Sequence, residues 1–376
     1  MAYGRINISF KRKRFSATAY QLEIRGTKAV HIPENYLSPA TCGVMTVAMV
    51  PVWVHAVKKV NKELPKDKIP LLGVGAAFSF LAMMFNIPLI GGTTGHAIGG
   101  TLIALLFGPN AACIAVSIAL LLQAVMFGDG GILAFGANCF NMAFVLPFVG
   151  YAVYRFIMKL AGDKNAKEVM HYVAAAIGSY IGINAAAFCA AIEFGIQPML
   201  FTDAAGNALY CPYDLSIAIP AMMIPHLAVA GFVEAAFTVV VFAFIRKTSP
   251  DLTYENILAE QAADTAVPAK KHIPVFAIIA VLIAAVPLGL LATGTAWGEW
   301  GADEIAEIVQ NGTALGYTPE GMANGWSLSS IFADYAMEGM NEVAAYILSA
   351  VIGVALLIII FKLISIPMKG KKRSAA

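Results

Sequence analysis

The sequence predicts an all-α membrane protein: a bundle of about seven transmembrane helices followed by a C-terminal two-helix transmembrane unit. Hydrophobic residues make up 59% of the 376 residues and charged residues only 13%, whereas charged residues are about 25% of a typical soluble domain. Several apolar stretches run for about 20 residues, the length of a helix that crosses a hydrocarbon core. The apolar residues do not alternate with period two, which argues against a β-barrel.

Nine apolar segments follow one another along the chain. We expect spans at about 39–60, 69–90, a short span ending near 107, then 111–127, 132–158, 169–194, 215–245, 273–293 and 343–366. Glycine, proline and polar residues separate them, as in Gly108-Pro109-Asn110.

Basic residues mark one side of these segments. Lysine and arginine cluster after the first, fifth, seventh and ninth spans, and the loops after the second, fourth, sixth and eighth spans have none. Because cytoplasmic loops carry the excess of Lys and Arg, we expect a multi-pass plasma-membrane protein with a cytoplasmic C-terminus. Position 30 and the loops 91–100 and 128–131 then lie outside.

We expect four regions along the chain. These are an N-terminal extension, 1–29, a transmembrane bundle, 30–247, a charged cytoplasmic linker, 248–271, and an accessory two-span unit, 272–376, with a large outer loop. The acidic residues of that loop, Asp303, Glu304 and Glu307, are expected on a solvated surface.

The extension, 1–29, is basic, with seven Lys or Arg residues against one acid, Glu23. It has no apolar core after KRKRF and is therefore not a signal peptide. One interpretation is a disordered basic tail on the cytoplasmic side, but the charge pattern places position 30 outside. We therefore hypothesise that the extension is not translated and that Val30 is an alternative start codon read as Met. N-terminal mass spectrometry tests this.

A chain that begins at position 30 has His31 as its second residue. The terminal amine, the His31 backbone nitrogen and its Nδ1 then chelate a cation through three nitrogens in a plane, and His96 in GGTTGHAIGG supplies the fourth. Square-planar nitrogen coordination suits Ni(II) or Cu(II) and accepts Co(II), whereas Mg and Ca prefer oxygen. The predicted metal ligands are thus Val30, His31 and His96. The alternative is that His96 caps a helix and the glycines only pack.

Three further polar residues could support these histidines. Asp129 lies in the GDGG loop, and Asn138 and Asn141 are three residues apart, on one helix face. They are expected to hold the histidines in one tautomer, or else to form hydrogen bonds between helices. The same alternatives hold for Gln123 and Glu193, and we expect Glu234 with Thr238 to be structural.

Several functions are excluded by missing motifs. The sequence has no G-x-x-x-x-G-K-[ST], H-E-x-x-H or G-x-S-x-G, so it has no ATP-binding P-loop and no recognisable hydrolase site. We expect no enzyme activity and no prosthetic group. A net charge of +2 gives no reason to expect a nucleic acid partner, and the five widely spaced cysteines fit a packing role.

Four stretches resemble the CbiM/NikM family, the substrate-capture components of energy-coupling-factor importers for cobalt and nickel. They are HIPENYLSPATCGVM, GGTTGHAIGG with LFGPN, QAVMFGDGGILAFGANCFNMAFV and PHLAVAGFVEAAFT. The family begins Met-His, and its ligand positions fall on Val30, His31 and His96. The extension 1–29 departs from the family pattern.

The resemblance implies Co²⁺ or Ni²⁺ as the transported ion. It also implies a transmembrane coupling protein and two cytoplasmic ATPase subunits as partners within the lipid membrane. The accessory unit is similar to the fused CbiN/NikN-like unit of some members. The alternative function is a stand-alone secondary metal permease, which would repeat carboxylates or histidines at the midplane of several spans.

Overall fold

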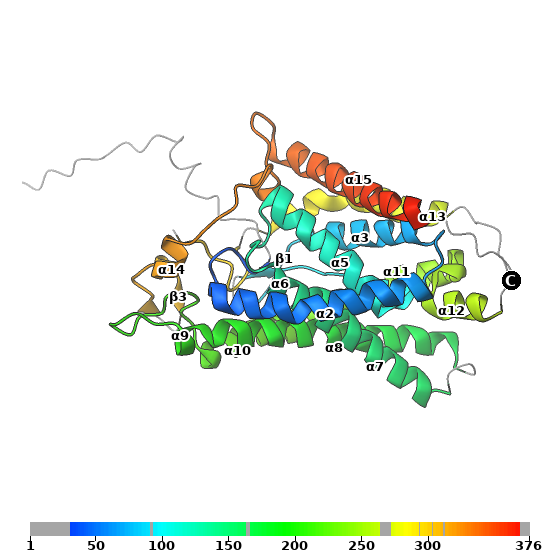
Figure 1. Ribbon diagram of the computed structural model, residues 1–376, viewed down its shortest axis with the longest axis horizontal. Helices are drawn as coiled ribbons and strands as arrows, with labels where there is room; N and C mark the ends of the chain where they lie inside the picture. Colours follow the sequence, from blue (N-terminus) through cyan, green and yellow to red (C-terminus); the bar gives the residue numbers. More distant parts are fainter. Residues whose placement is uncertain are drawn as a thin grey trace, which may run out of the picture.

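The computed structural model describes residues 31–90, 93–162, 166–263, 272–292, 294–302, 304–310 and 313–368. The helices lie roughly side by side between two ends (Figure 1). The α9/α14 end carries α9 (Gln197–Leu200) and α14 (Glu320–Ala323), and the α12 end carries α12 (Tyr254–Ala262). The extension 1–29 and Val30 lie outside the described residues.

The first part of the chain supplies most of the bundle. Its helices are α2 (Pro39–Glu63), α3 (Ile69–Met83), α4 (Gly100–Phe107), α5 (Pro109–Leu122), α6 (Phe135–Asn138), α7 (Leu146–Leu160), α8 (Glu168–Gly195), α10 (Leu215–Pro225) and α11 (Gly231–Thr248). Three π-helical segments join or extend them: η1 (Gln123–Phe127), η2 (Cys139–Val145) and η4 (His226–Ala230). A 3₁₀ turn, η5 (Pro250–Leu252), precedes α12.

The accessory unit contributes two long elements and an irregular loop between them. The long elements are α13 (Ile273–Ala285), extended by η6 (Val286–Leu291), and α15 (Glu342–Met368). The loop holds η7 (Ile305–Glu307), the two-residue strands β3 (Val309–Gln310) and β4 (Thr313–Ala314), α14 and η8 (Ala333–Tyr335).

The predicted all-α membrane class is confirmed. Among the described residues, seven helical stretches are long and apolar enough to cross a membrane. They are Pro39–Glu63, Pro109–Phe127, Phe135–Leu160, Glu168–Leu200, Leu215–Thr248, Ile273–Leu291 and Glu342–Ile366. The second and third expected spans correspond to two shorter helices, α3 and α4.

The second span is shorter than predicted because its helix ends at Met83 instead of continuing to 90. Pro88 cannot donate a backbone hydrogen bond and disfavours helix at the residue before it. The chain instead forms an antiparallel pair, β1 (Ile87–Pro88) with β2 (Thr94–Gly95). This hairpin leads directly to His96.

Close backbone contact holds the centre of the bundle together. A Cβ added at Gly178 of α8 would lie 2.5 Å from the carbonyl oxygen of Gly150 in α7, and one at Gly182 would lie 2.7 Å from the carbonyl of Leu146. The small residues of α8 are therefore used for packing within this chain. Such small-residue contacts let membrane helices approach closely.

The accessory unit packs on α3. A Cβ at Gly73 would meet Phe361 of α15 at 2.8 Å, and one at Gly353 of α15 would meet Phe80 at 2.3 Å. The Tyr346 hydroxyl donates a hydrogen bond of 2.7 Å to the carbonyl of Met84, where α3 ends. These contacts fix the loop of the accessory unit over the α9/α14 end.

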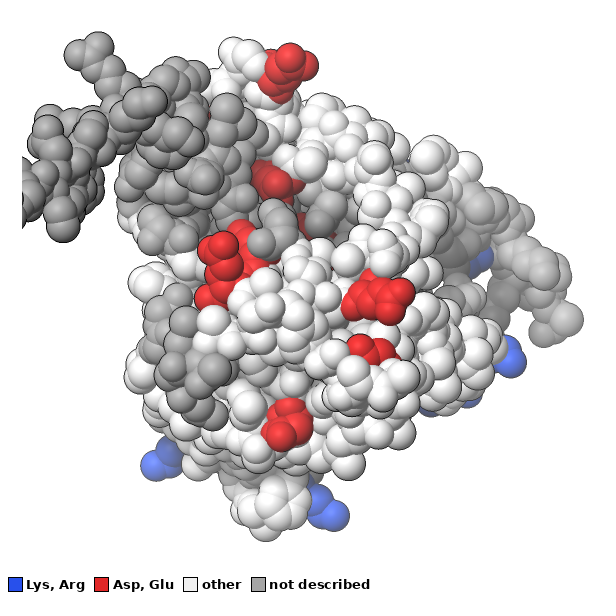
Figure 2. Space-filling view, turned by 90° about the vertical axis from the view of Figure 1, so that its left-hand side faces the viewer, with Lys and Arg blue, Asp and Glu red and all other residues white. Residues whose placement is uncertain are grey.

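The two ends of the bundle differ in charge. Figure 2 looks onto the α9/α14 end, where acidic side chains lie on the face and basic ones appear only at its margin. The described basic residues all belong to segments of the other end: Lys58, Lys59, Lys62, Lys66, Lys68, Arg155, Lys159, Lys167, Arg246, Lys247 and Lys362.

Candidate metal centre

The segment that begins at His31 lies in a cradle formed by the 128–133 loop and α6. Ile32 N–H donates to Asn138 Oδ1 at 3.1 Å, and Asn138 Nδ2 donates back to the Ile32 carbonyl at 3.2 Å. Gly131 N–H donates to the same carbonyl at 2.9 Å. The backbone next to His31 is therefore held on both sides, and the His31 side chain is buried.

Glu34, three residues after His31, holds the same segment in place. Its carboxylate accepts the backbone N–H of Ile132 at 2.7 Å and of Leu133 at 3.3 Å. Partial burial raises the pKa of Glu34, and the two N–H donors oppose that rise. A Cβ at Gly131 would lie 2.8 Å from the Glu34 nitrogen, so this loop position requires glycine.

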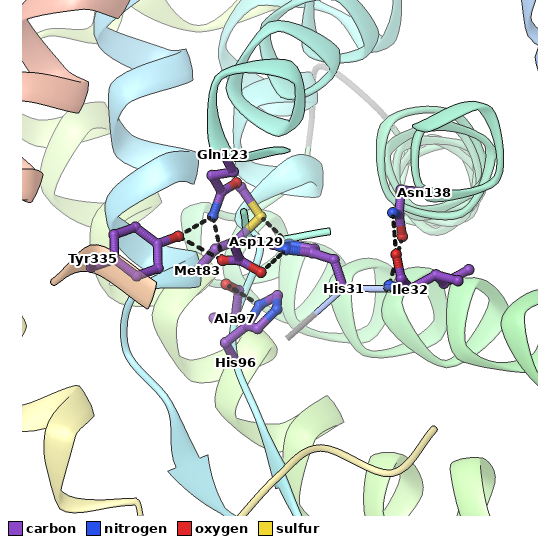
Figure 3. Close-up of polar contacts among 9 residues, drawn as sticks. All are labelled: His31, Ile32, Met83, His96, Ala97, Gln123, Asp129, Asn138 and Tyr335. Atoms are coloured by element: carbon purple, nitrogen blue, oxygen red, sulfur yellow. Dashed lines mark hydrogen bonds and ion pairs between the residues drawn. The ribbon is translucent and has the colours of Figure 1, made fainter. Parts of the chain in front are cut away.

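Asp129 is the centre of a buried hydrogen-bond network (Figure 3). Its Oδ1 lies 2.5 Å from His31 Nδ1, and its Oδ2 accepts from the Tyr335 hydroxyl at 2.6 Å and from Gln123 Nε2 at 3.2 Å. Gln123 Nε2 also donates to the Tyr335 oxygen at 3.0 Å. A carboxylate only accepts, so Nδ1 of His31 carries the hydrogen, and its Nε2 lies 3.4 Å from Met83 Sδ.

His96 faces His31 across a small cavity. The two ring centroids are 5.2 Å apart and the rings are inclined by 56°. His96 Nδ1 donates to the Ala97 carbonyl at 3.2 Å, so in the neutral form the ring hydrogen is on Nδ1 and the acceptor lone pair is on Nε2. Both histidines line a cavity of about 100 Å³.

Glu234 positions the chain just after His96. Its carboxylate accepts the backbone N–H of Ile98 at 2.8 Å and of Gly99 at 3.0 Å. Gly99 has a φ of +71°, in the left-handed region that favours glycine. Glu234 thus has structural contacts, as expected, but Thr238 does not share them, since its hydroxyl has no hydrogen-bond partner among the described residues.

The structure brings four of the predicted site residues together: His31, His96, Asp129 and Asn138. Asn138 bonds the backbone of Ile32 and not a histidine ring. Asn141 donates to Glu193 Oε2 of α8 at 2.9 Å, because the π-helical turn η2 begins between the two asparagines and rotates Asn141 away. Val30 lies outside the described residues.

No group of three or more His, Cys, Asp or Glu side chains within the described part of the chain is arranged to hold a metal ion. The two imidazoles supply only two of the four nitrogen ligands of the expected square-planar site. The expected site needs the nitrogens of position 30 and of the His31 backbone as well.

Residues of the accessory loop reach this region, a contact that we did not predict from the sequence. Trp297 N–H donates to Thr93 Oγ1 at 2.7 Å, and Thr94 Oγ1 donates to the Gly294 carbonyl at 3.2 Å, next to His96. Glu299 lies two residues after Trp297 and lines the cavity of His31 and His96. Burial and the negative charge of Asp129 raise the pKa of Glu299 well above its usual range.

A signal for this contact was present in the sequence. The stretch Ala296-Trp297-Gly298-Glu299-Trp300 places two tryptophans around a carboxylate in an otherwise polar loop. Gly298 has a φ of +85°, and a Cβ there would lie 2.8 Å from the Phe194 ring. Of the loop acids expected on a solvated surface, Glu307 is exposed and Glu304 is partly buried, while Asp303 lies outside the described residues.

These features define a class: a helical membrane protein with a small cavity, lined by imidazoles, near one end of its bundle. A family model for the cobalt uptake substrate-specific transmembrane region, CbiM, matches residues 31–252, and one for the PDGLE domain matches residues 270–369. The chain belongs to the CbiM family and carries a CbiN-like C-terminal unit.

Relatives with both parts match most of the chain. The probable fused nickel transport protein LarMN of Lactiplantibacillus plantarum is 46% identical, over 89% of this chain and 97% of its own length. The fused nickel transport protein NikMN of Rhodobacter capsulatus is 44% identical, over 88% and 95%. A crystal structure of a transition metal transporter is 53% identical with a TM-score of 0.55, over 62% of this chain and 99% of that one.

Proposed function

We propose that this protein captures Ni²⁺ or Co²⁺ as the substrate-specific component of an energy-coupling-factor importer. The observation that carries the proposal is the 5.2 Å separation of the His31 and His96 rings, which line one cavity. The relatives named as nickel transport proteins support the choice of ion. The same nitrogen ligands serve nickel and cobalt.

The proposed ligands are the amine of position 30, the backbone nitrogen and Nδ1 of His31, and Nε2 of His96. Without the ion, His31 Nδ1–H donates a hydrogen bond to Asp129 Oδ1. An ion bound at Nδ1 requires the ring hydrogen to lie on Nε2 instead, where it faces Met83 Sδ, so the imidazole stays neutral and Asp129 stays ionised. Its negative charge then lies beside the bound cation.

The proposed direction of transport follows from charge. The α9/α14 end, which has no described Lys or Arg, is the outer side by the positive-inside rule. The ion is captured there, and the C-terminus lies in the cytoplasm. Because the sequence has no P-loop, a coupling protein and two ATPase subunits supply the energy for release inward.

Metal content tests the capture site. The purified full chain is loaded with Ni²⁺ or Co²⁺, washed with a weak chelator and analysed for metal. The variants His31→Ala and His96→Ala are treated in the same way. The control is His55→Ala, which changes an exposed histidine in α2 near the α12 end. We expect about one retained ion in the wild type and the control, and none in the other two. Full retention in both site variants would reject the proposed site.

Two further measurements test the rest of the proposal. Mass spectrometry of the intact protein shows whether the mature chain begins at position 30, and a chain that begins at Ala2 would contradict the amine ligand. Metal uptake is compared in cells with and without the ATPase subunits. Uptake that continues without them would favour a stand-alone permease.

A further inference from the structure

The accessory loop lines one side of the cavity that His31 and His96 also line. Trp297 packs against Phe194 and Tyr213, with ring centroids 6.1 and 5.6 Å away. Its backbone is bonded to Thr93. The loop therefore forms a wall of the cavity and adds its own side chains to the lining, among them Glu299.

Glu299 is the unusual member of that wall. Only 7% of the residue is exposed, and its Oε2 is buried without a hydrogen-bond partner within the described part of the chain. None of the described lysines and arginines belongs to this end of the bundle. A buried carboxylate without a cation is costly, and a site that receives cations would explain its presence.

His226, at the start of η4, also lines the cavity. Its Nδ1 lies 2.7 Å from the Met222 carbonyl oxygen. A carbonyl only accepts, so Nδ1 carries the hydrogen and Nε2 keeps its lone pair. This backbone contact orients the ring as it does for many metal-binding histidines. His226 also begins the π-helical segment η4, and such segments are frequent at functional sites.

We propose that Glu299 and His226 form a receiving site, where a divalent cation is held before it passes to His31 and His96. This inference rests on the proposed capture function. One oxygen and one nitrogen ligand suit Co²⁺ and Ni²⁺. A cavity of about 100 Å³ also has room for several waters, since one water needs roughly 10–15 Å³ by this measure. The cation therefore keeps part of its hydration here.

The two sites act in succession and not together. Two divalent cations in so small a cavity would repel each other strongly at low dielectric. The Asp129 carboxylate lies beside the His31 end of the cavity, and Glu299 belongs to the accessory loop. A cation is thus drawn from the loop side toward His31.

Stopped-flow binding of Co²⁺ to the purified full chain tests the proposal. The variants are Glu299→Gln and His226→Gln, and the control is Glu320→Gln, which removes an exposed carboxylate of the same loop. We expect Co²⁺ to associate about tenfold more slowly, or slower still, with both variants than with the wild type. The metal content of the variants after hours should equal that of the wild type, and the association rate of the control should be unchanged. Unchanged final content also shows that the variants fold.

A second arm removes the capture site. His31→Ala should still bind Co²⁺ weakly, with the absorption spectrum of a high-spin oxygen and nitrogen site, and adding Glu299→Gln should abolish that binding. Wild-type association rates in both single variants, or weak binding that survives the double change, would overturn the receiving site. A wild type that retains no metal would instead overturn the capture function and this inference with it.

Discussion

His31 Nδ1 lies 2.5 Å from Asp129 Oδ1, and both side chains are buried. This contact ties the predicted metal ligand to the GDGG loop 98 residues away. It also occupies, in the ion-free protein, the ring nitrogen that the proposed chelate uses. Capture of an ion therefore exchanges one partner of His31 for another.

Replacing Asp129 should weaken capture without abolishing it. Asp129→Asn keeps the shape but removes the negative charge beside the site, and loss of such a supporting carboxylate typically costs about 10–100-fold in metal affinity. Isothermal titration with Ni²⁺ measures this. Asp203→Asn, in an exposed loop, is the control and should bind like the wild type. Equal affinities in both variants would show that the Asp129 charge does not support the site.

Tyr335→Phe should loosen the link between the accessory unit and the bundle. The change removes the hydroxyl that donates to Asp129 and accepts from Gln123. It leaves buried polar groups short of a partner, at a cost of about 1–3 kcal/mol. Thermal unfolding in detergent should show a lower midpoint. Tyr210→Phe is the control, because its hydroxyl makes no hydrogen bond to another described residue; an equal fall in both would point to a general effect of losing a hydroxyl.

Glu34→Gln should release part of the segment that carries His31. Gln still offers an oxygen to Ile132 and Leu133 but not a charge, and charge-assisted hydrogen bonds are worth about 1 kcal/mol more than neutral ones. We expect weaker Ni²⁺ binding and faster proteolysis near position 34. Glu307→Gln changes an exposed acid of the accessory loop and should alter neither. Unchanged binding in Glu34→Gln would mean that Asn138 and Gly131 suffice to hold the segment.

Two glycine substitutions should have opposite effects. In Gly178→Ala the new Cβ meets the Gly150 carbonyl at 2.5 Å, so α7 and α8 must separate, at a cost of about 1–3 kcal/mol. Gly43→Ala in α2 meets nothing within 4 Å and should be neutral or more stable by about 0.5–1 kcal/mol. Unfolding of both variants in the same detergent compares them directly. Equal stabilities would argue against tight α7–α8 packing.

The sequence by itself determined the class of fold. Apolar length and the position of Lys and Arg are properties of short stretches, so the spans and the charge difference between the ends could be predicted from them. His31 and His96 stood out for the same reason, as polar residues at the edges of apolar segments. The end of α3 at Met83 was misjudged, since the short hairpin after it is only a few residues long.

Only the tertiary structure decided which side chains meet. Tyr335 reaches Asp129 across 206 residues, and Trp297 reaches Thr93 across 204. No local pattern encodes such pairings, because they depend on how α15 packs on α3 and carries the loop over the bundle. Glu299 was not among the residues singled out from the sequence, because its place in the cavity depends on that packing.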